Sequence, residues 1–248
     1  MKYHAITDVG RMRSQNQDNV YGTTSPIGPL PNLFLVADGM GGHNAGDYAS
    51  RRAIELVKES VEQSPGTEPV EVLRTAITTA NDMLFSEARQ QEEKSGMGTT
   101  FVAATIVNEE LLVANVGDSR LYVLHDGQLR QITLDHSLVE EMVRTGSMSQ
   151  EMAYHHPKKH MITRAVGAED KVDIDFFDVS LFGDEIILLC SDGLSNMVED
   201  DRIRELLLTK ESAQQRAESL VQAANQKGGR DNITVIVVEP FSSEVKAC

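Results

Sequence analysis

Short acidic segments that follow apolar runs are the feature that most constrains this chain. Asp38 directly follows the apolar run 33–37, and Asp192 follows a second run, 185–190, after one serine. Such runs fit strands buried on both faces, although their pattern alone does not exclude a piece of helix. A carboxylate at the end of a buried strand is costly unless something pairs with it. Glycine stands beside each of these carboxylates. Several such carboxylates in one chain indicate a single partner that they share. Carboxylate, carbonyl and water oxygens are the ligands that Mg²⁺ and Mn²⁺ prefer, so the sequence predicts a divalent metal site.

An Asp-Gly pair alone is weak evidence for such a site, because aspartate and glycine also form ordinary turns. Asp126-Gly127 lies between two strand-like segments and predicts a type I′ hairpin turn, in which both central residues take positive φ. Asp38 and Asp192 differ from Asp126 because each follows a buried run. Arg13 is one of few cations near the acidic segments, and its guanidinium could either bind phosphate oxygens or form a surface ion pair.

Several common catalytic sites are excluded by the sequence. It contains no GxxxxGK[ST] phosphate loop, no HExxH zinc motif and no GxSxG nucleophile elbow. The two cysteines, Cys190 and Cys248, cannot form a thiolate zinc site and do not imply a disulfide framework.

Charge and hydropathy limit the partners and the compartment. The 248 residues carry a formal net charge of −15, a field that repels nucleic acid and anionic membranes. The same field repels a phosphorylated substrate unless cations reverse its sign at the site. No run is long and apolar enough to span a bilayer, and the first residues lack the apolar region of a signal peptide. We therefore expect a monomeric, cytoplasmic protein that binds neither nucleic acid nor membrane.

Periodicity predicts helices toward both ends of the chain with strands between them. Apolar residues recur at helical spacing over 45–63 and 69–93, and again over 200–208 and 212–226. The predicted strands are 2–8, 33–37, 99–107, 111–116, 121–125, 128–133, 172–179, 185–190 and 233–239. Residues 135–165 are polar and rich in methionine and histidine, and they predict an excursion from the main fold. This order favours an antiparallel sandwich with helices on both faces.

A series of short segments, taken in order, resembles the metal-dependent protein phosphatases of the type 2C class in their bacterial form. The segments are 7–10, 13–19, 37–43, 98–100, 115–120, 134–136, 163–167, 191–194 and 229–232. The resemblance implies an α+β fold, a four-layer α-β-β-α sandwich whose two central antiparallel sheets are flanked by helices. It implies one domain over 1–248, with a flap at about 135–165 that contributes to substrate choice. It also implies hydrolysis of phosphoserine and phosphothreonine in proteins, dependent on Mn²⁺ or Mg²⁺.

Carried over by position, the resemblance assigns the metal ligands. Asp38 would bridge two metal ions, and the carbonyl of Gly39 would bind one of them. Asp192 and Asp231 would hold the other ion. Asp118 would bind a third, weaker ion, shared with Asp192.

The remaining implied roles concern water, phosphate and the leaving group. Asp18 would accept a hydrogen bond from a metal-bound water, and Arg13 would bind the substrate phosphate. Two neighbouring ions lower the pKa of a shared water, so that hydroxide can attack phosphorus directly while the ions and Arg13 balance the phosphoryl charge. Met40 stands where eukaryotic members carry a histidine proposed as general acid. His43 is then a candidate for that role, although it could equally cap a helix, and a metal-bound water could protonate the leaving group instead.

Three functions compete at this point. The first is an active Ser/Thr phosphoprotein phosphatase that opposes a bacterial Ser/Thr kinase and acts on the kinase and its substrates. The second is a binding module without turnover, whose mark would be the loss of Asp38, Asp192 or Asp231, and none of them is lost. The third is a dedicated stress-response regulator, which usually carries an extra sensor domain that we do not expect in a chain of this length.

Overall fold

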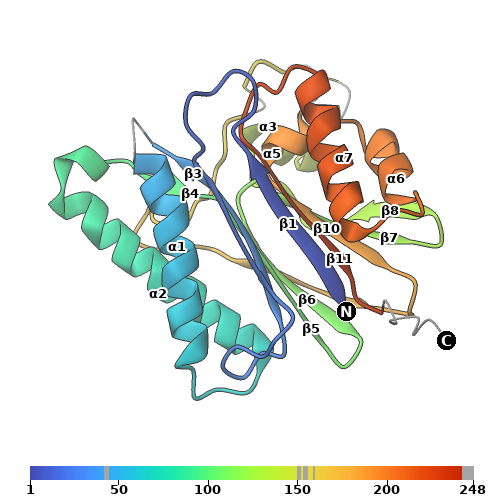
Figure 1. Ribbon diagram of the computed structural model, residues 1–248. Coiled ribbons are helices and arrows are strands. Elements are labelled where there is room, and N and C mark those ends of the chain that lie inside the picture. Colours follow the sequence, from blue (N-terminus) through green and yellow to red (C-terminus); the bar gives the residue numbers. More distant parts are fainter. Residues whose placement is uncertain (42–44, 150–151, 153–155, 159, 242–248) are drawn as a thin grey trace.

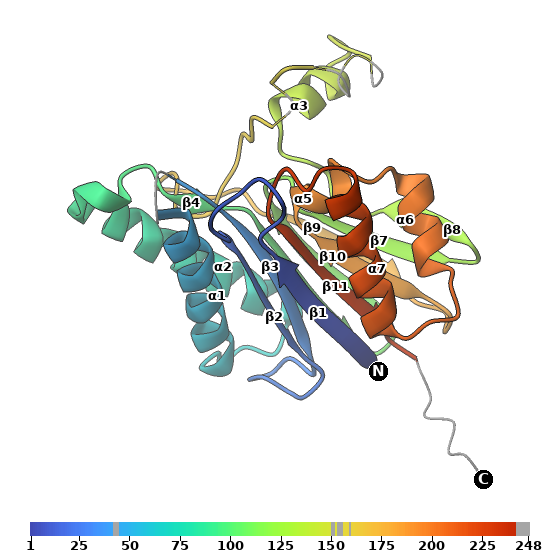
Figure 2. The same ribbon diagram turned by 45° about the horizontal axis from the view of Figure 1, so that its top comes forward.

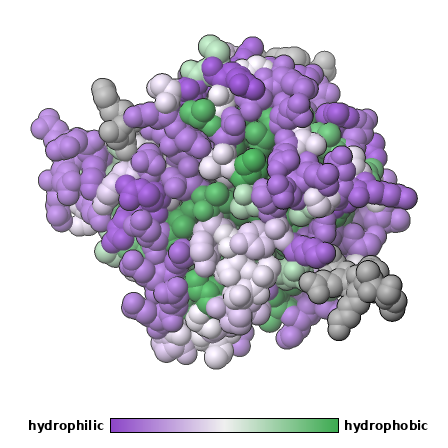
Figure 3. All heavy atoms as spheres, in the orientation of Figure 1, coloured by the Kyte–Doolittle hydropathy of each residue, from purple (hydrophilic) through white to green (hydrophobic). Residues whose placement is uncertain are grey.

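Two antiparallel sheets lie face to face between two layers of helices (Figure 1). The computed structural model describes the chain apart from residues 42–44, 150–151, 153–155, 159 and 242–248. The α-β-β-α sandwich and the α+β class expected from the sequence are confirmed. In Figure 3 hydrophilic residues dominate the helical flanks, and apolar residues show mainly in the band between them.

The first sheet has five strands in the order β1-β11-β10-β7-β8. These strands are β1 (Lys2–Asp8), β7 (Arg120–His125), β8 (Gln128–Gln131), β10 (Ile186–Cys190) and β11 (Ile233–Glu239). The second sheet has six strands, in the order β2-β3-β5-β6-β9 with β4 paired to β3. Its strands are β2 (Asp18–Thr23), β3 (Leu33–Met40), β4 (Gly98–Thr99), β5 (Phe101–Val107), β6 (Glu110–Val116) and β9 (Asp175–Ser180).

One pair of helices covers the outer face of each sheet (Figure 1). α1 (Ala45–Glu62) and α2 (Pro69–Gln90) lie on the second sheet, while α6 (Asp200–Leu207) and α7 (Ala213–Gln226) lie on the first. The shorter helices are a 3₁₀ turn (Glu92–Lys94), α3 (Leu138–Arg144) and α5 (Asp192–Ser195).

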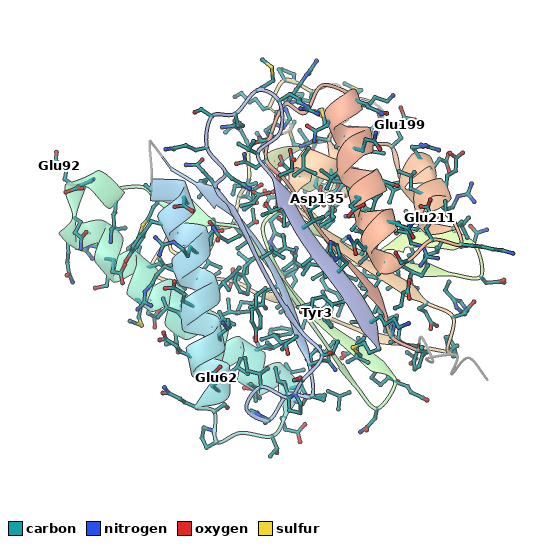
Figure 4. The ribbon with its side chains drawn as sticks, viewed as in Figure 1. Tyr3, Glu62, Glu92, Asp135, Glu199 and Glu211 are labelled. Carbon is teal, nitrogen blue, oxygen red and sulfur yellow. The ribbon has the colours of Figure 1, made fainter. Side chains whose placement is uncertain are left out.

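The continuous apolar runs arise because the central strands are buried on both faces. Along β3, Leu33, Leu35 and Ala37 pack toward α1 and α2, whereas Phe34 and Val36 pack into the core between the sheets. Side chains alternate across a strand, so a strand with cores on both sides has no polar face. The side chain of Tyr3, labelled in Figure 4, helps to join the two sheets, because its ring packs edge-on against that of Phe34 with centroids 5.3 Å apart.

The hairpin turn predicted at Asp126-Gly127 is confirmed. Asp126 and Gly127 have φ values of +47° and +70°, as the predicted type I′ turn requires. Strand 172–179 was placed too early, because β9 begins at Asp175. Helix 69–93 was predicted too long, because α2 ends at Gln90. The sequence analysis missed β2, whose residues are only half-buried, and the single turn of α5.

The segment 135–165 leaves the sandwich at one end and returns to it (Figure 2). It contains α3, whose N-cap Ser137 accepts a hydrogen bond from the backbone N–H of Glu140. Its two limbs meet in a bridge between Ser137 and Ile162. We call this segment the flap.

Candidate metal and phosphate site

Aspartates from distant parts of the chain converge at the end of the sandwich that carries the flap. Asp18 lies opposite Asp38 in the register of β2 and β3. Asp192 begins α5, directly after β10, and Asp231 lies just before β11. Asp118 occupies the turn between β6 and β7.

Most of the site residues predicted from the sequence line one cavity of about 600 Å³. The predicted residues in its wall are Arg13, Asp38, Gly39, Asp118, Asp192 and Asp231. Asp18 does not line the cavity and lies behind it, with only 4% of its surface exposed. His43, the candidate general acid, lies outside the described residues.

Two of these carboxylates have an oxygen without a hydrogen-bond donor in the part of the chain that the structure describes. Among the described residues, Asp18 Oδ1 and Asp192 Oδ1 are buried without a hydrogen-bond partner. The other oxygen of Asp18 accepts from Ser191 Oγ at 2.7 Å, and that of Asp192 accepts from Asn196 Nδ2 at 2.8 Å. A buried, unpaired polar atom costs free energy comparable to a lost hydrogen bond.

Burial and repulsion between the carboxylates also raise the pKa of several of these aspartates. Burial, and then repulsion from neighbouring carboxylates, raises the pKa of Asp38 and of Asp118 well above the usual range for aspartate. Burial raises the pKa of Asp18 to about 7, although the bond from Ser191 acts in the opposite direction. Burial, then Asp231, also raises the pKa of Asp192. A divalent cation relieves both the burial cost and the repulsion, and this all-oxygen set fits Mn²⁺ or Mg²⁺.

Glycine follows Asp38 and Asp192 because other backbone segments press against both positions. A Cβ on Gly39 would lie 2.0 Å from the Gly46 carbonyl oxygen, and one on Gly193 would lie 1.9 Å from that of Asn232. No side chain fits at either distance. The Asp-Gly pairs at the two strand ends are therefore packing requirements that also bring backbone close to the carboxylates.

Threonines hold the backbone of Asp38 in place. Thr100 Oγ1 accepts from its amide at 3.0 Å, and Thr99 Oγ1 donates to its carbonyl at 2.8 Å. Since both threonines are buried, the orientation of Asp38 is set before any ion binds.

Arg13 enters the site on the loop between β1 and β2. Its Nη2 donates to Asp231 Oδ2 at 2.8 Å, and half of its side chain (52%) is exposed. The loop is tied down by Asn232, whose side chain accepts from the amide of Gln17 and donates to the carbonyls of Val9 and Gln15. The guanidinium thus contacts Asp231 in the site and keeps about half of its side chain exposed.

Two other arginines serve the fold instead. Arg120 forms a bidentate pair with Asp135, labelled in Figure 4, with an Nη2–Oδ2 distance of 2.7 Å. Arg164 Nη1 donates to Asp175 Oδ1 at 2.9 Å beside His136.

Several cavity residues were not singled out by the sequence analysis. Two are cationic or can become so, His160 from the flap and Arg230 from the loop before β11, and two are apolar, Ile162 and Met197. Met40, which stands at the position of the eukaryotic histidine, also lines the cavity. The richness of the flap in histidine and methionine was the only signal for His160. Nothing in the sequence distinguished it from the other flap histidines.

Comparison with known proteins agrees with this geometry. The protein phosphatase 2C family matches residues 11–233. The chain belongs to that family. It is 43% identical over 237 residues to the serine/threonine phosphatase stp of Listeria welshimeri, covering 94% of this chain and 93% of the relative. It is therefore an enzyme, a metal-dependent protein serine/threonine phosphatase.

Solved structures show the same fold. The serine/threonine phosphatase Stp1 from Staphylococcus aureus superposes with a TM-score of 0.89 at 33% identity, covering 97% of this chain and 95% of that one. The catalytic domain of the phosphatase PstP, solved in complex with two manganese ions, superposes with a TM-score of 0.83 at 34% identity, covering 95% of this chain and 96% of PstP. Among the described residues of the present chain, no helix is long and apolar enough to cross a membrane.

Proposed function

We propose that Asp38, Asp192 and Asp231 hold the two core ions of this phosphatase and that Arg13 binds the phosphate of its substrate. The observation that carries the proposal is the convergence of four aspartates on one cavity, where, among the described residues, Asp192 and Asp18 behind it each keep a buried oxygen without a donor. In a chain of net charge −15, such a cavity admits a phosphate dianion only after cations have neutralised it.

The ligand assignment follows the position of each group. Asp38, opposite Asp18 in the register of β2 and β3, would bridge the two ions, and the Gly39 carbonyl would bind one of them. Asp192 and Asp231 would hold the second. Asp118, 8% exposed in the same cavity wall, would hold a third ion with Asp192. When bound, the ions supply Lewis acidity and a nucleophilic water at neutral pH.

The protein's own groups would orient the reactants. Arg13 would use its open face to donate to phosphoryl oxygens while Asp231 holds its other side. Asp18, fixed by Ser191, leaves one oxygen free to accept a hydrogen bond from water in the cavity. The flap supplies His160 and Ile162 to the wall and would contact the protein around the phosphorylated residue.

We further propose that the chain acts as one domain, as a monomer in a bacterial cytoplasm, and opposes a Ser/Thr kinase. A phosphatase of this specificity requires a reaction that forms phosphoserine and phosphothreonine, and a protein kinase is the class that does so. Mn²⁺ and Mg²⁺ are both suited to the all-oxygen ligand set. Light scattering on the purified protein tests the monomer, and a dimer would contradict it.

The direct test is hydrolysis of phosphothreonine and phosphoserine peptides with Mn²⁺ or Mg²⁺, with and without chelator, for wild type, Asp38→Asn and Asp126→Asn. We expect metal-dependent turnover in wild type and its loss in Asp38→Asn, because the bridging ligand loses its charge. Asp126→Asn changes the Asp-Gly pair of the hairpin, far from the cavity wall, and should keep wild-type rates. Metal-independent turnover, or normal activity in Asp38→Asn, would contradict the assignment, and no turnover at all would favour a binding module.

A further inference from the structure

The flap places one imidazole in the wall of the catalytic cavity. His160 lines this cavity together with Arg13 and Arg230, which come from two other segments of the chain. The side chain of His160 is exposed, so a substrate can reach it. The view in Figure 2 shows the flap rising from the end of the sandwich at which the loop between β1 and β2, the carrier of Arg13, also lies.

Hydrogen bonds at the base of the flap fix the backbone next to His160. The amide of Leu138 donates to the carbonyl of Met161 at 2.8 Å, and the amide of Thr163 donates to the carbonyl of His136 at 2.8 Å. The amide of Met161 also donates to the carbonyl of Lys158 at 3.1 Å, which closes a turn around His160. His160 therefore stands on an anchored turn, directly before a residue whose carbonyl is bonded across the base.

The exit limb of the flap is anchored as well. Thr163 Oγ1 donates to Glu141 Oε1 at 2.9 Å, and Arg164 is paired with Asp175. Nδ1 of buried His136 accepts from the Gly117 amide at 3.1 Å, and its Nε2 lies 3.1 Å from Asp175 Oδ2. These bonds tie the flap to the turn that carries Asp118.

His160 is close enough to the carboxylates to act on them electrostatically. It lowers the pKa of Asp192, against the larger effect of burial, and Arg13 acts in the same direction. An imidazole has an N–H donor in either neutral tautomer and two when charged, so it can bind a phosphoryl oxygen in any protonation state.

We propose that His160 is a substrate-binding residue whose imidazole N–H donates to a phosphoryl oxygen held in the cavity. This inference deepens the proposed function, since it rests on the phosphate lying beside Arg13. His160 and Arg13 then bind the phosphate from two separate segments, and the flap contributes directly to the affinity for phosphate as well as to contacts with the rest of the substrate.

The test compares His160→Ala, His160→Gln and His156→Ala. His156 is the matched control, because it belongs to the same flap, accepts from the Lys158 amide at 3.2 Å and does not line the cavity. The probes are p-nitrophenyl phosphate in steady-state kinetics and inorganic phosphate in calorimetry, both with saturating Mn²⁺.

We expect His160→Ala to raise the KM and the Kd of inorganic phosphate by about 10-fold, the lower end of the range for a hydrogen bond to a charged group, because the site is exposed. The kcat should change less. His160→Gln retains an N–H donor and should recover most of the affinity. His156→Ala should leave both constants within about twofold of wild type.

Unchanged KM and Kd in His160→Ala would overturn the proposal. Equal effects of His160→Ala and His156→Ala would also overturn it, because they would show a role in the fold of the flap alone. The failure of the proposed function would look different. In that case wild type itself would show no metal-dependent hydrolysis, while the Kd of phosphate would still report on His160.

Discussion

Strand β10 has an acidic residue near each end, and the two carboxylates differ in their hydrogen-bond donors. Glu185 precedes the strand, and its carboxylate oxygens accept from the backbone amides of Phe182 at 2.6 Å and Gly183 at 2.9 Å. His125 Nδ1 lies 3.2 Å from the same carboxylate. Asp192 follows the strand, and its Oδ1 has no partner among the described residues.

The difference shows what identifies a metal site in this fold. His125, Asp184 and Glu185 lie close enough together to hold an ion, with their ligand atoms within 4.8 Å of one another. Those atoms already have partners, because backbone amides donate to Glu185 and the His125 imidazole lies within hydrogen-bond distance of Asp184. Burial of an acid does not by itself require a cation. Burial without donors does, and this condition holds at the Asp192 end.

The largest contrast should be in catalysis. Asp192→Asn should lower kcat for p-nitrophenyl phosphate by about 10³-fold, equivalent to about 4 kcal/mol, because a ligand charge is lost. Glu185→Gln should stay within about twofold of wild type. Comparable losses in the two variants, measured at saturating Mn²⁺, would remove the distinction between the two ends of β10.

Metal binding should stabilise the fold through the site at Asp192 and not through the cluster of His125, Asp184 and Glu185. Mn²⁺ at 100 times its Kd should stabilise wild type by about 2.7 kcal/mol, because the ion binds the folded chain alone. Thermal unfolding with Mn²⁺ or chelator measures this shift. Glu185→Gln should retain it and Asp192→Asn should lose most of it. The reverse pattern would place the ion at the other cluster.

Without metal, the same two substitutions should change stability in opposite directions. Glu185→Gln should lower the free energy of unfolding by about 1–3 kcal/mol, because an amide N–H of the new side chain faces a backbone donor. Asp192→Asn should raise it by about 1 kcal/mol, because an unpaired buried charge disappears. Urea unfolding in chelator decides the signs, and destabilisation by Asp192→Asn would show that its charge is already compensated.

A further effect is expected on the pH dependence of the stability of the metal-free protein. Because burial raises the pKa of Asp18 to about 7, the folded state binds more protons than the unfolded state between about pH 4 and 7. This contribution to stability is therefore lost as pH rises through that window. His136, whose pKa is lowered by burial, acts in the opposite direction.

Asp18→Asn isolates the contribution of Asp18. The variant should match wild type near pH 4 and be more stable than wild type at pH 7.5, in chelator. Parallel stability curves for the two proteins across this range would mean that Asp18 titrates normally.

The fold and the positions of the acidic residues could be predicted from the sequence. Which end of β10 binds metal could not be predicted from it. Burial on both faces of β3 requires an apolar run that is visible in the sequence, and Asp38-Gly39 marks where this run ends. Glu185 and Asp192 both flank such a run, and only the turn that presents amides to Glu185 tells them apart. Those donors are backbone amides. Because every residue except proline has one, the residue types do not show where the amides point.

Long-range contacts set a second limit. Arg13 meets Asp231 across 218 positions of the chain, and His160 reaches the cavity only because hydrogen bonds at the base of the flap place it there. The family resemblance supplied the role of Arg13 by position. It gave no role to His160, because no motif quoted for the family includes that residue.

The central claim is that the aspartates around the cavity hold a pair of ions and that the cluster at Glu185 holds none, and anomalous diffraction from a crystal grown in Mn²⁺ tests it most directly. We predict two manganese peaks among Asp38, Asp192 and Asp231, and none at His125, Asp184 and Glu185. An empty space between the three aspartates, or manganese bound only beside Glu185, would contradict the account.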